Sequence, residues 1–234
     1  MPNPVIATRE EWLKARLDLL QREREHTRLK DEITRARQAL PWVRVEKPYV
    51  FETETGNQTL SDLFGHHSQL ITYHFMFGPA WEEGCKSCSF WADSYEGLSE
   101  HFAARDIAFT AVSSAPLDRL LEFKSRMGWT FNWVSSFQNG FNHDLDVGFD
   151  ETRPEDRSRA YNFGIMPEAI MDEMHGTSVF ARDEDGTVYH TYSMYGRGLD
   201  ATNAAYAYID LTPKGRHEPK EGNPMAWVKH HDRY

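Results

Sequence analysis

The sequence of 234 residues has very little cysteine, because Cys85 and Cys88 are the only two. It also has no run of about 18 apolar residues, which a membrane-spanning helix needs, and its first residues lack the apolar segment of a signal peptide. The sequence therefore predicts a cytoplasmic protein without a membrane partner. Thiols are kept reduced in the cytoplasm, so we expect the cysteine pair to be catalytic or metal-binding rather than a structural disulfide.

An excess of positive charge is missing as well, since the formal net charge is −10. An acidic surface repels phosphate backbones, so we expect no nucleic-acid partner. The sequence has no glycine-rich phosphate loop and no Ser-His-Asp arrangement, and we expect no cofactor. Apolar residues nevertheless make up 40% of the chain. The mean hydropathy of −0.66 therefore indicates a charged surface around a normal core rather than disorder.

Residues 1–41 are predicted to form a helical arm. Thr8 and Glu11 have the spacing of a capping box, in which each side chain binds the other residue's main-chain N–H. Apolar residues recur at helical spacing along the arm, except between Gln21 and Arg28, where we expect a break or bend. The apolar stripe predicts either packing on the arm's own domain or a homo-oligomer contact through this helix.

The pattern changes to α/β in residues 42–212, and residues 213–234 are predicted to be a C-terminal tail. Nearly continuous β-branched, aromatic and apolar residues indicate a buried central strand at 69–77. The other elements expected are a helix at 85–104, a strand at 107–112, a helix at 117–127, a strand at 129–134, long loops at 135–167, a hairpin of strands 177–182 and 187–192, and a helix at 200–211 capped by Asp200.

The two cysteines lie three residues apart in the segment Gly84-Cys85-Lys86-Ser87-Cys88, at the predicted start of a helix. The unpaired N–H groups and the positive end of the helix dipole favour a thiolate at this position. The thiolate is the attacking species in disulfide exchange. We therefore expect Cys85 to be the nucleophile, with Lys86 as a nearby cation, and Cys88 to be the resolving thiol one turn further on.

Four stretches of this sequence resemble the DUF899 family of bacterial proteins, which are described as thioredoxin-like dithiol-disulfide oxidoreductases. The stretches are YHFMFGPAWEEGCKSCSFWAD, RMGWTFNWVSS, FNHDLDVGF and GTSVFARDEDGTVYHTYSMYGRGLD, and they extend from Tyr73 to Asp200. The resemblance implies a thioredoxin-like fold, a central mixed β-sheet flanked by helices. An N-terminal helical extension and a long loop-rich insertion would be added to it. The activity that it implies is itself an inference from fold.

Three departures from the usual pattern of this superfamily surround the dithiol. The place of the usual cis-proline, before the first hairpin strand, holds His175-Gly176-Thr177. The tryptophan that normally precedes the first cysteine is displaced to Trp81. Glu82 stands three residues before Cys85, where a peroxiredoxin has a threonine or serine. These departures count against two functions that the superfamily suggests, general disulfide reduction and peroxidase activity.

Three hypotheses about function remain open at this point. The first is thiol-disulfide exchange through Cys85 and Cys88 with an unidentified thiol or disulfide partner. The second is a non-catalytic binding module that uses the arm or a pocket over the dithiol. The third is a metal site made by the two cysteines and His175, although the cysteine pair alone supplies too few ligands. The residues expected to bind a substrate or line the pocket are Trp81, Lys86, His175, Gly176, Thr177, Asn142 and Arg197. Asn139 and Asp144 are expected to add to its polar lining.

Overall fold

The computed structural model describes residues 4–149, 161–166 and 171–234. The chain divides into two compact units, Met1–Pro41 and Trp42–Tyr234. The segment 213–234 thus lies in the same compact unit as the α/β domain. No helix in the described ranges is both long and apolar enough to cross a membrane.

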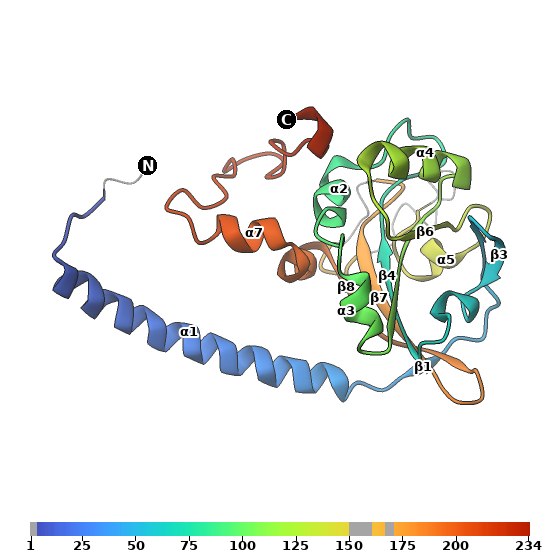
Figure 1. The fold of residues 1–234 in the computed structure, drawn as a ribbon, viewed down its shortest axis with the longest axis horizontal. Coiled ribbons are helices and arrows are strands. Elements are labelled where there is room, and N and C mark those ends of the chain that lie inside the picture. The colour runs from blue at the N-terminus through green and yellow to red at the C-terminus, as the bar shows by residue number, and fades with distance from the viewer. Residues whose placement is uncertain (1–3, 150–160, 167–170) are drawn as a thin grey trace. The chain divides into compact units, whose positions relative to one another are not determined.

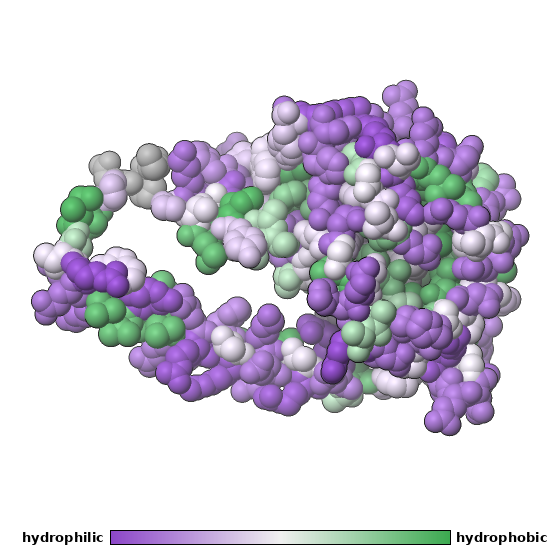
Figure 2. Space-filling model, viewed as in Figure 1, coloured by the Kyte–Doolittle hydropathy of each residue, from purple (hydrophilic) through white to green (hydrophobic). Residues whose placement is uncertain are grey.

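The first unit consists of one helix, α1 (Arg9–Gln38), with the expected capping box between Thr8 and Glu11. The predicted break at 21–28 is wrong, because the helix is continuous there. The stretch 21–28 contains neither glycine nor proline, and its Glu23 pairs with Arg16 of the preceding turns at 2.7 Å. No residue of α1 is buried, and Figure 2 shows apolar patches within its charged surface.

Eight strands of the second unit form one mixed sheet, in the order β1-β8-β7-β4-β5-β6-β2-β3 (Figure 1). The strands are β1 (Val43–Arg44), β2 (Val50–Thr53), β3 (Gly56–Thr59), β4 (Gln69–His74), β5 (Ile107–Ser113), β6 (Asn132–Ser135), β7 (Gly176–Arg182) and β8 (Val188–Tyr195). Strands β4, β5 and β6 are parallel, whereas β7 runs antiparallel to both β4 and β8. The three parallel strands β4, β5 and β6 are followed by the β7–β8 hairpin, which pairs on the other side of β4, and this arrangement is a thioredoxin-like fold.

Helices flank the sheet, and several differ from the sequence-based expectation. Those described in the second unit are α2 (Lys86–Ala92), α3 (Ser99–Ala103), α4 (Leu117–Met127), α5 (Phe141–Asp144) and α7 (Ala204–Ile209), with 3-10 turns at Asp62–Phe64, Gly196–Thr202 and His231–Arg233. The single helix expected at 85–104 is wrong, since turns separate α2 from α3 and Gly97 adopts a φ of +75° there. The last helix is capped by Asn203, whose side chain accepts from the N–H of Tyr206, rather than by Asp200.

The two faces of the sheet bury separate apolar clusters. One cluster contains Tyr73 and Phe75 from the β4 segment together with Cys88 from α2. The other contains Leu70 from the same strand with Phe141 from α5. Strand β4 is therefore buried on both sides, as its composition predicts, and it connects the core directly to the segment that carries the cysteines.

Candidate dithiol site

Cys85 occupies the N-cap position of α2, directly before the first helical residue, Lys86. The N–H of Cys85 donates to the carbonyl of Met76, over 3.0 Å, which ties the helix start to the chain leaving β4. The carbonyl of Cys85 accepts from both the N–H and the hydroxyl of Ser89, at 2.9 and 3.0 Å. Cys85 is partly exposed and also packs against the core cluster. The residue that the sequence predicts to be the nucleophile is therefore not fully enclosed by the core.

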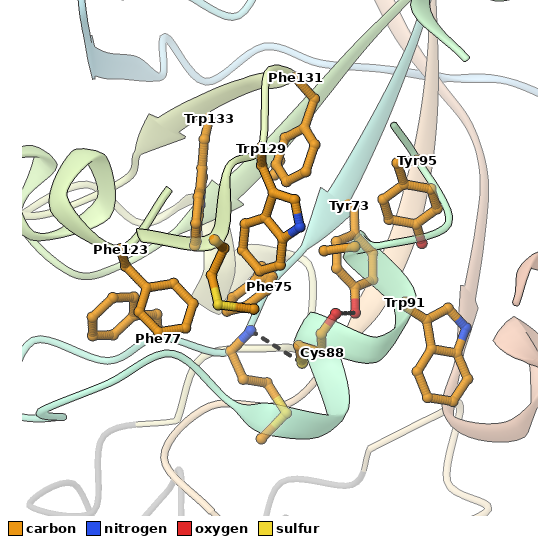
Figure 3. Close-up of a cluster of buried hydrophobic side chains, with 14 of the residues drawn as sticks. Tyr73, Phe75, Phe77, Cys88, Trp91, Tyr95, Phe123, Trp129, Phe131 and Trp133 are labelled. Atoms are coloured by element: carbon orange, nitrogen blue, oxygen red, sulfur yellow. Dashed lines mark hydrogen bonds between the residues drawn. The ribbon is translucent and has the colours of Figure 1, made fainter. Parts of the chain in front are cut away.

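Cys88 lies one turn further on and is 2% exposed. Its Sγ accepts a hydrogen bond of 3.5 Å from the N–H of Met76, and its carbonyl accepts from the hydroxyl of Tyr73. Figure 3 shows both interactions beside a cluster of aromatic rings that includes Trp129 and Trp133. The second thiol is thus enclosed by the core, and α2 presents only the first to the surface.

The two thiols differ in acidity because their surroundings differ. The hydrogen bond from the Cys88 thiol lowers the pKa of Cys85 to about 7, and the N–H groups of Cys88 and Ser87 act in the same direction against burial. Burial raises the pKa of Cys88 well above its usual value, and the nearby Cys85 raises it further. Near neutral pH Cys85 is therefore the thiol that ionises more readily, while Cys88 remains a neutral hydrogen-bond donor.

The loop between β4 and Cys85 is held by contacts from two other parts of the chain. The indole N–H of Trp81 donates to both carboxylate oxygens of Asp172 at 3.1 Å. Arg119 on α4 donates to the carbonyl of Pro79 at 2.9 Å and to the carbonyl of Trp81. Trp81 is a partly buried neighbour of the cluster that contains Cys88. The displaced tryptophan therefore anchors the loop that precedes the dithiol.

The segment 225–234 packs beside the start of α2, which the sequence did not indicate. The ammonium of Lys86 donates to the carbonyl of Ala226 at 3.3 Å, and the rings of Phe90 and Trp227 meet edge to face. The His230 ring donates to the carbonyl of Gly84, and Arg233 pairs with Glu83. The hydrogen-bonded partners in these pairs lie 140 to 150 residues apart in sequence. Local patterning therefore carries no signal for them.

His175, Gly176 and Thr177 lie at the start of β7. The His175 ring is partly buried and packs near Trp91 of α2, with 6.0 Å between ring centroids. Burial lowers the pKa of His175, so its neutral form is favoured. Gly176 pairs with His74 on one side and Tyr195 on the other, and Thr177 continues both ladders. The main chain of Gly176 and Thr177 therefore faces sheet neighbours on both sides.

The contacts of Asn142 and Arg197 described here do not include Cys85 or Cys88. Arg197 is exposed and pairs with Asp200 at 3.3 Å. Asn142 is buried and donates to Glu173 at 3.2 Å. It lines an open pocket of about 810 Å³ that also includes Asn139 and Asp144. The described lining of that pocket contains neither cysteine, so these three polar residues share a pocket that does not include the dithiol.

Glu173 is the most unusual group of this pocket. Its carboxyl is 5% exposed, accepts from Asn142 and pairs with the hydroxyl of Ser114. Burial raises its pKa to about 8, and the neighbouring Asp172 contributes in the same direction. The carboxyl is therefore largely protonated near neutral pH. A lone Glu in a loop-rich segment carries no pattern, so the sequence does not indicate this group.

The described part of the chain contains no group of three His, Cys, Asp or Glu side chains that could hold a metal ion. The third hypothesis, in which His175 completes a ligand set with Cys85 and Cys88, therefore finds no support in the geometry.

A thioredoxin-like fold with a CxxC pair at the start of the helix after the central strand defines the class of this protein. The chain belongs to the family described as "Bacterial protein of unknown function (DUF899)", which matches residues 1–234. No curated protein matches the chain.

Several solved structures resemble the chain at low sequence identity. Peroxidoxin BcpB from Mycobacterium tuberculosis is 16% identical, with 73% of this chain and 96% of that chain covered and a TM-score of 0.44. Peroxiredoxin Q from Xanthomonas campestris is 16% identical, with 70% and 89% covered and a TM-score of 0.43. A candidate thiol:disulfide interchange protein DsbE from Chlorobium tepidum is 14% identical, with 71% and 98% covered and a TM-score of 0.39.

Proposed function

We propose that this protein is a thiol-disulfide oxidoreductase that acts through Cys85 and Cys88. The observation that carries the proposal is the asymmetry of the pair. A partly exposed thiol with a lowered pKa caps α2, and a buried thiol with a raised pKa lies one turn further on. An exposed thiolate suits attack on a substrate, and a protected neighbour suits the second, intramolecular step.

The reaction proceeds in two exchanges of sulfur partners. The Cys85 thiolate attacks one sulfur of a substrate disulfide, forming a mixed disulfide and releasing the other substrate sulfur as a thiolate, which takes up a proton. Cys88 then loses its proton and attacks the Cys85 sulfur, which releases the second substrate thiol. The protein ends with a Cys85–Cys88 disulfide, and the substrate has gained two electrons. A low-molecular-weight thiol or a partner dithiol must reduce the protein again for a further cycle.

Peroxide reduction is not part of this proposal. Glu82 occupies the position three residues before Cys85, where the peroxiredoxin pattern needs a hydroxyl group. The partner we propose is a thiol or disulfide compound of the cytoplasm. A net charge of −10 makes a nucleic acid an unfavourable partner.

The test is a redox titration of the purified protein in buffers of oxidised and reduced glutathione. We expect one intramolecular disulfide, seen by mass spectrometry as the loss of two hydrogen atoms and reversed by dithiothreitol. Cys85→Ser and Cys88→Ser serve as controls, because neither can form the bond. Two free thiols after oxidation of a protein with an unchanged near-ultraviolet circular dichroism spectrum would reject the proposal.

A further inference from the structure

The peptide group between Gly84 and Cys85 is held at both of its polar atoms. Its N–H, which belongs to Cys85, donates to the carbonyl of Met76 at 3.0 Å. Its carbonyl, which belongs to Gly84, lies 2.9 Å from Nε2 of His230. A peptide group is planar, so fixing both atoms fixes the direction in which the chain enters α2 at Cys85.

The site around this peptide is closely packed. A Cβ atom on Gly84 would lie 2.8 Å from the Phe75 ring and 2.9 Å from the Phe123 ring, so only glycine fits between them. The His230 ring is 5% exposed and packs edge to face on Phe123, with 5.2 Å between centroids. His230 therefore packs beside the narrow space between Phe75 and Phe123 that holds Gly84.

The direction of the hydrogen bond between His230 and Gly84 follows from the chemistry of the two groups. A carbonyl only accepts, so Nε2 must carry a hydrogen atom to bond Gly84. Nδ1 lies 3.3 Å from a guanidinium nitrogen of Arg126 and 3.7 Å from a carboxylate oxygen of Glu83. The donor to Gly84 is therefore the Nε2–H group of the ring.

Charged groups hold the segment that carries His230 against the loop that carries Cys85. Arg126 on α4 bonds Asp232 at 2.8 and 3.0 Å and Glu83 at 2.9 Å. Arg233 bonds the other carboxylate oxygen of Glu83, also at 2.9 Å. Glu83 thereby connects the loop, α4 and the C-terminal segment. Within this network, His230 contacts Gly84, the residue that follows Glu83 in the loop.

We propose that His230 is a positioning residue for Cys85, fixing the Gly84–Cys85 peptide so that the Cys85 thiol faces the free N–H groups at the start of α2. The inference rests on the proposed function. The N–H groups of Ser87 and Cys88 stabilise the Cys85 thiolate only while Cys85 stays in the N-cap position. Without the bond from His230, the peptide is fixed at one atom instead of two, and the thiolate loses part of this stabilisation.

The experiment measures the rate of alkylation of Cys85 by iodoacetamide against pH in the full-length protein, with the labelled residue identified by peptide mass spectrometry. Three variants at one position separate the roles of the ring. His230→Leu removes the hydrogen-bond donor. His230→Asn keeps an amide group near Arg126, but its side chain is too short to reach the carbonyl of Gly84. His230→Gln has a longer side chain, whose amide N–H can reach that carbonyl. His231→Ala is the matched control, because His231 contacts Asp93 instead.

We expect the midpoint of the pH–rate profile to rise by about half a unit to one unit in His230→Leu and His230→Asn. It should return toward the wild-type value in His230→Gln and stay unchanged in His231→Ala. If His230→Leu does not fold, the comparison of Asn with Gln decides. Equal midpoints in the Asn and Gln variants, or an equal shift in the control, would overturn the inference. Preferential labelling of Cys88 in the wild type would instead overturn the proposed function.

Discussion

The main chain of Met76 contacts both cysteines: its N–H donates to Sγ of Cys88 and its carbonyl accepts from the N–H of Cys85. Met76, in the segment that follows β4, therefore both fixes the start of α2 and provides a donor for the buried thiol. Both contacts use main-chain atoms, so they depend on the path of the chain after β4 rather than on the side chain at this position. The relationship also links the core directly to the acidity of the pair, which can be measured.

Cys85 should be labelled before Cys88 by iodoacetamide, and its rate should rise with pH through a midpoint of about 7. The reason is that the thiolate is the reactive species, and the pKa of Cys85 is lowered whereas that of Cys88 is raised. Peptide mapping after short labelling at several pH values measures both rates. A midpoint near the usual value of a free thiol would show that the N-cap position does not stabilise the thiolate.

Glu173→Gln should make stability less dependent on pH. The pKa of Glu173 is raised from 4.5 to about 8, so the folded state keeps a proton that the unfolded state releases. The stabilising contribution is therefore complete below 4.5 and is lost as pH rises through 8. Glutamine cannot ionise, so the Tm of the variant should fall less than that of the wild type between about pH 6 and about pH 9.

The matched control for Glu173→Gln is Asp172→Asn, which changes the adjacent carboxylate, the acceptor of the Trp81 indole. It should leave most of the pH dependence in place. Parallel Tm profiles for the wild type and Glu173→Gln over the whole range would mean that Glu173 is ionised in the folded protein.

Gly176→Ala should destabilise the fold by about 1–3 kcal/mol. A Cβ atom at this position would lie 2.6 Å from the Tyr195 ring, which is buried and cannot move aside freely. Gly198→Ala is the control, because its Cβ would lie at an ordinary 3.5 Å from Met194. Urea unfolding gives both free energies. Equal values for the two variants would show that strand β8 can shift to accept the methyl group.

Deleting residues 1–41 should leave a folded protein with a lower state of association. The remaining unit contains the whole sheet, whereas α1 buries none of its residues and exposes apolar side chains such as Leu17 and Ile33. We propose that a second copy of the chain covers this apolar stripe. Sedimentation measures the association, and the near-ultraviolet circular dichroism spectrum reports the fold. A truncated protein that associates like the full chain would reject self-association through α1.

The parts of the fold that the sequence predicts well are those with a local signal. The composition of β4 shows burial on both faces, and the turn at Asp183–Gly186 marks the β7–β8 hairpin. The helix expected at 85–104 has apolar residues on both sides of Gly97, but Gly97 takes a positive φ and the chain turns there. The apolar pattern continues through this turn, so periodicity alone cannot locate it.

The candidate site also has features that a local sequence signal predicts and features that depend on distant partners. The spacing of Cys85 and Cys88 and the helix start between them are local, and the sequence predicts both. Glu173 and His230 act through partners that are distant in sequence: Glu173 contacts Ser114, 59 residues away, and His230 contacts Gly84, 146 residues away. The prolines and charges of the segment 213–234 predict a tail, because the partners of this segment are distant in sequence. No local pattern in the segment indicates that His230 is buried.

The ion pair between Glu83 and Arg233 can form only after the C-terminal residues have been synthesised. The ribosome makes the cysteine segment, β4 and α4 long before it reaches residue 226, so Gly84 and Glu83 lack their C-terminal partners through most of translation. Contacts that close so long a loop form late in folding, because the entropy of closure must be overcome first. A growing chain therefore carries its CxxC pair on a loop that lacks its contacts with His230 and Arg233 until those residues have been made.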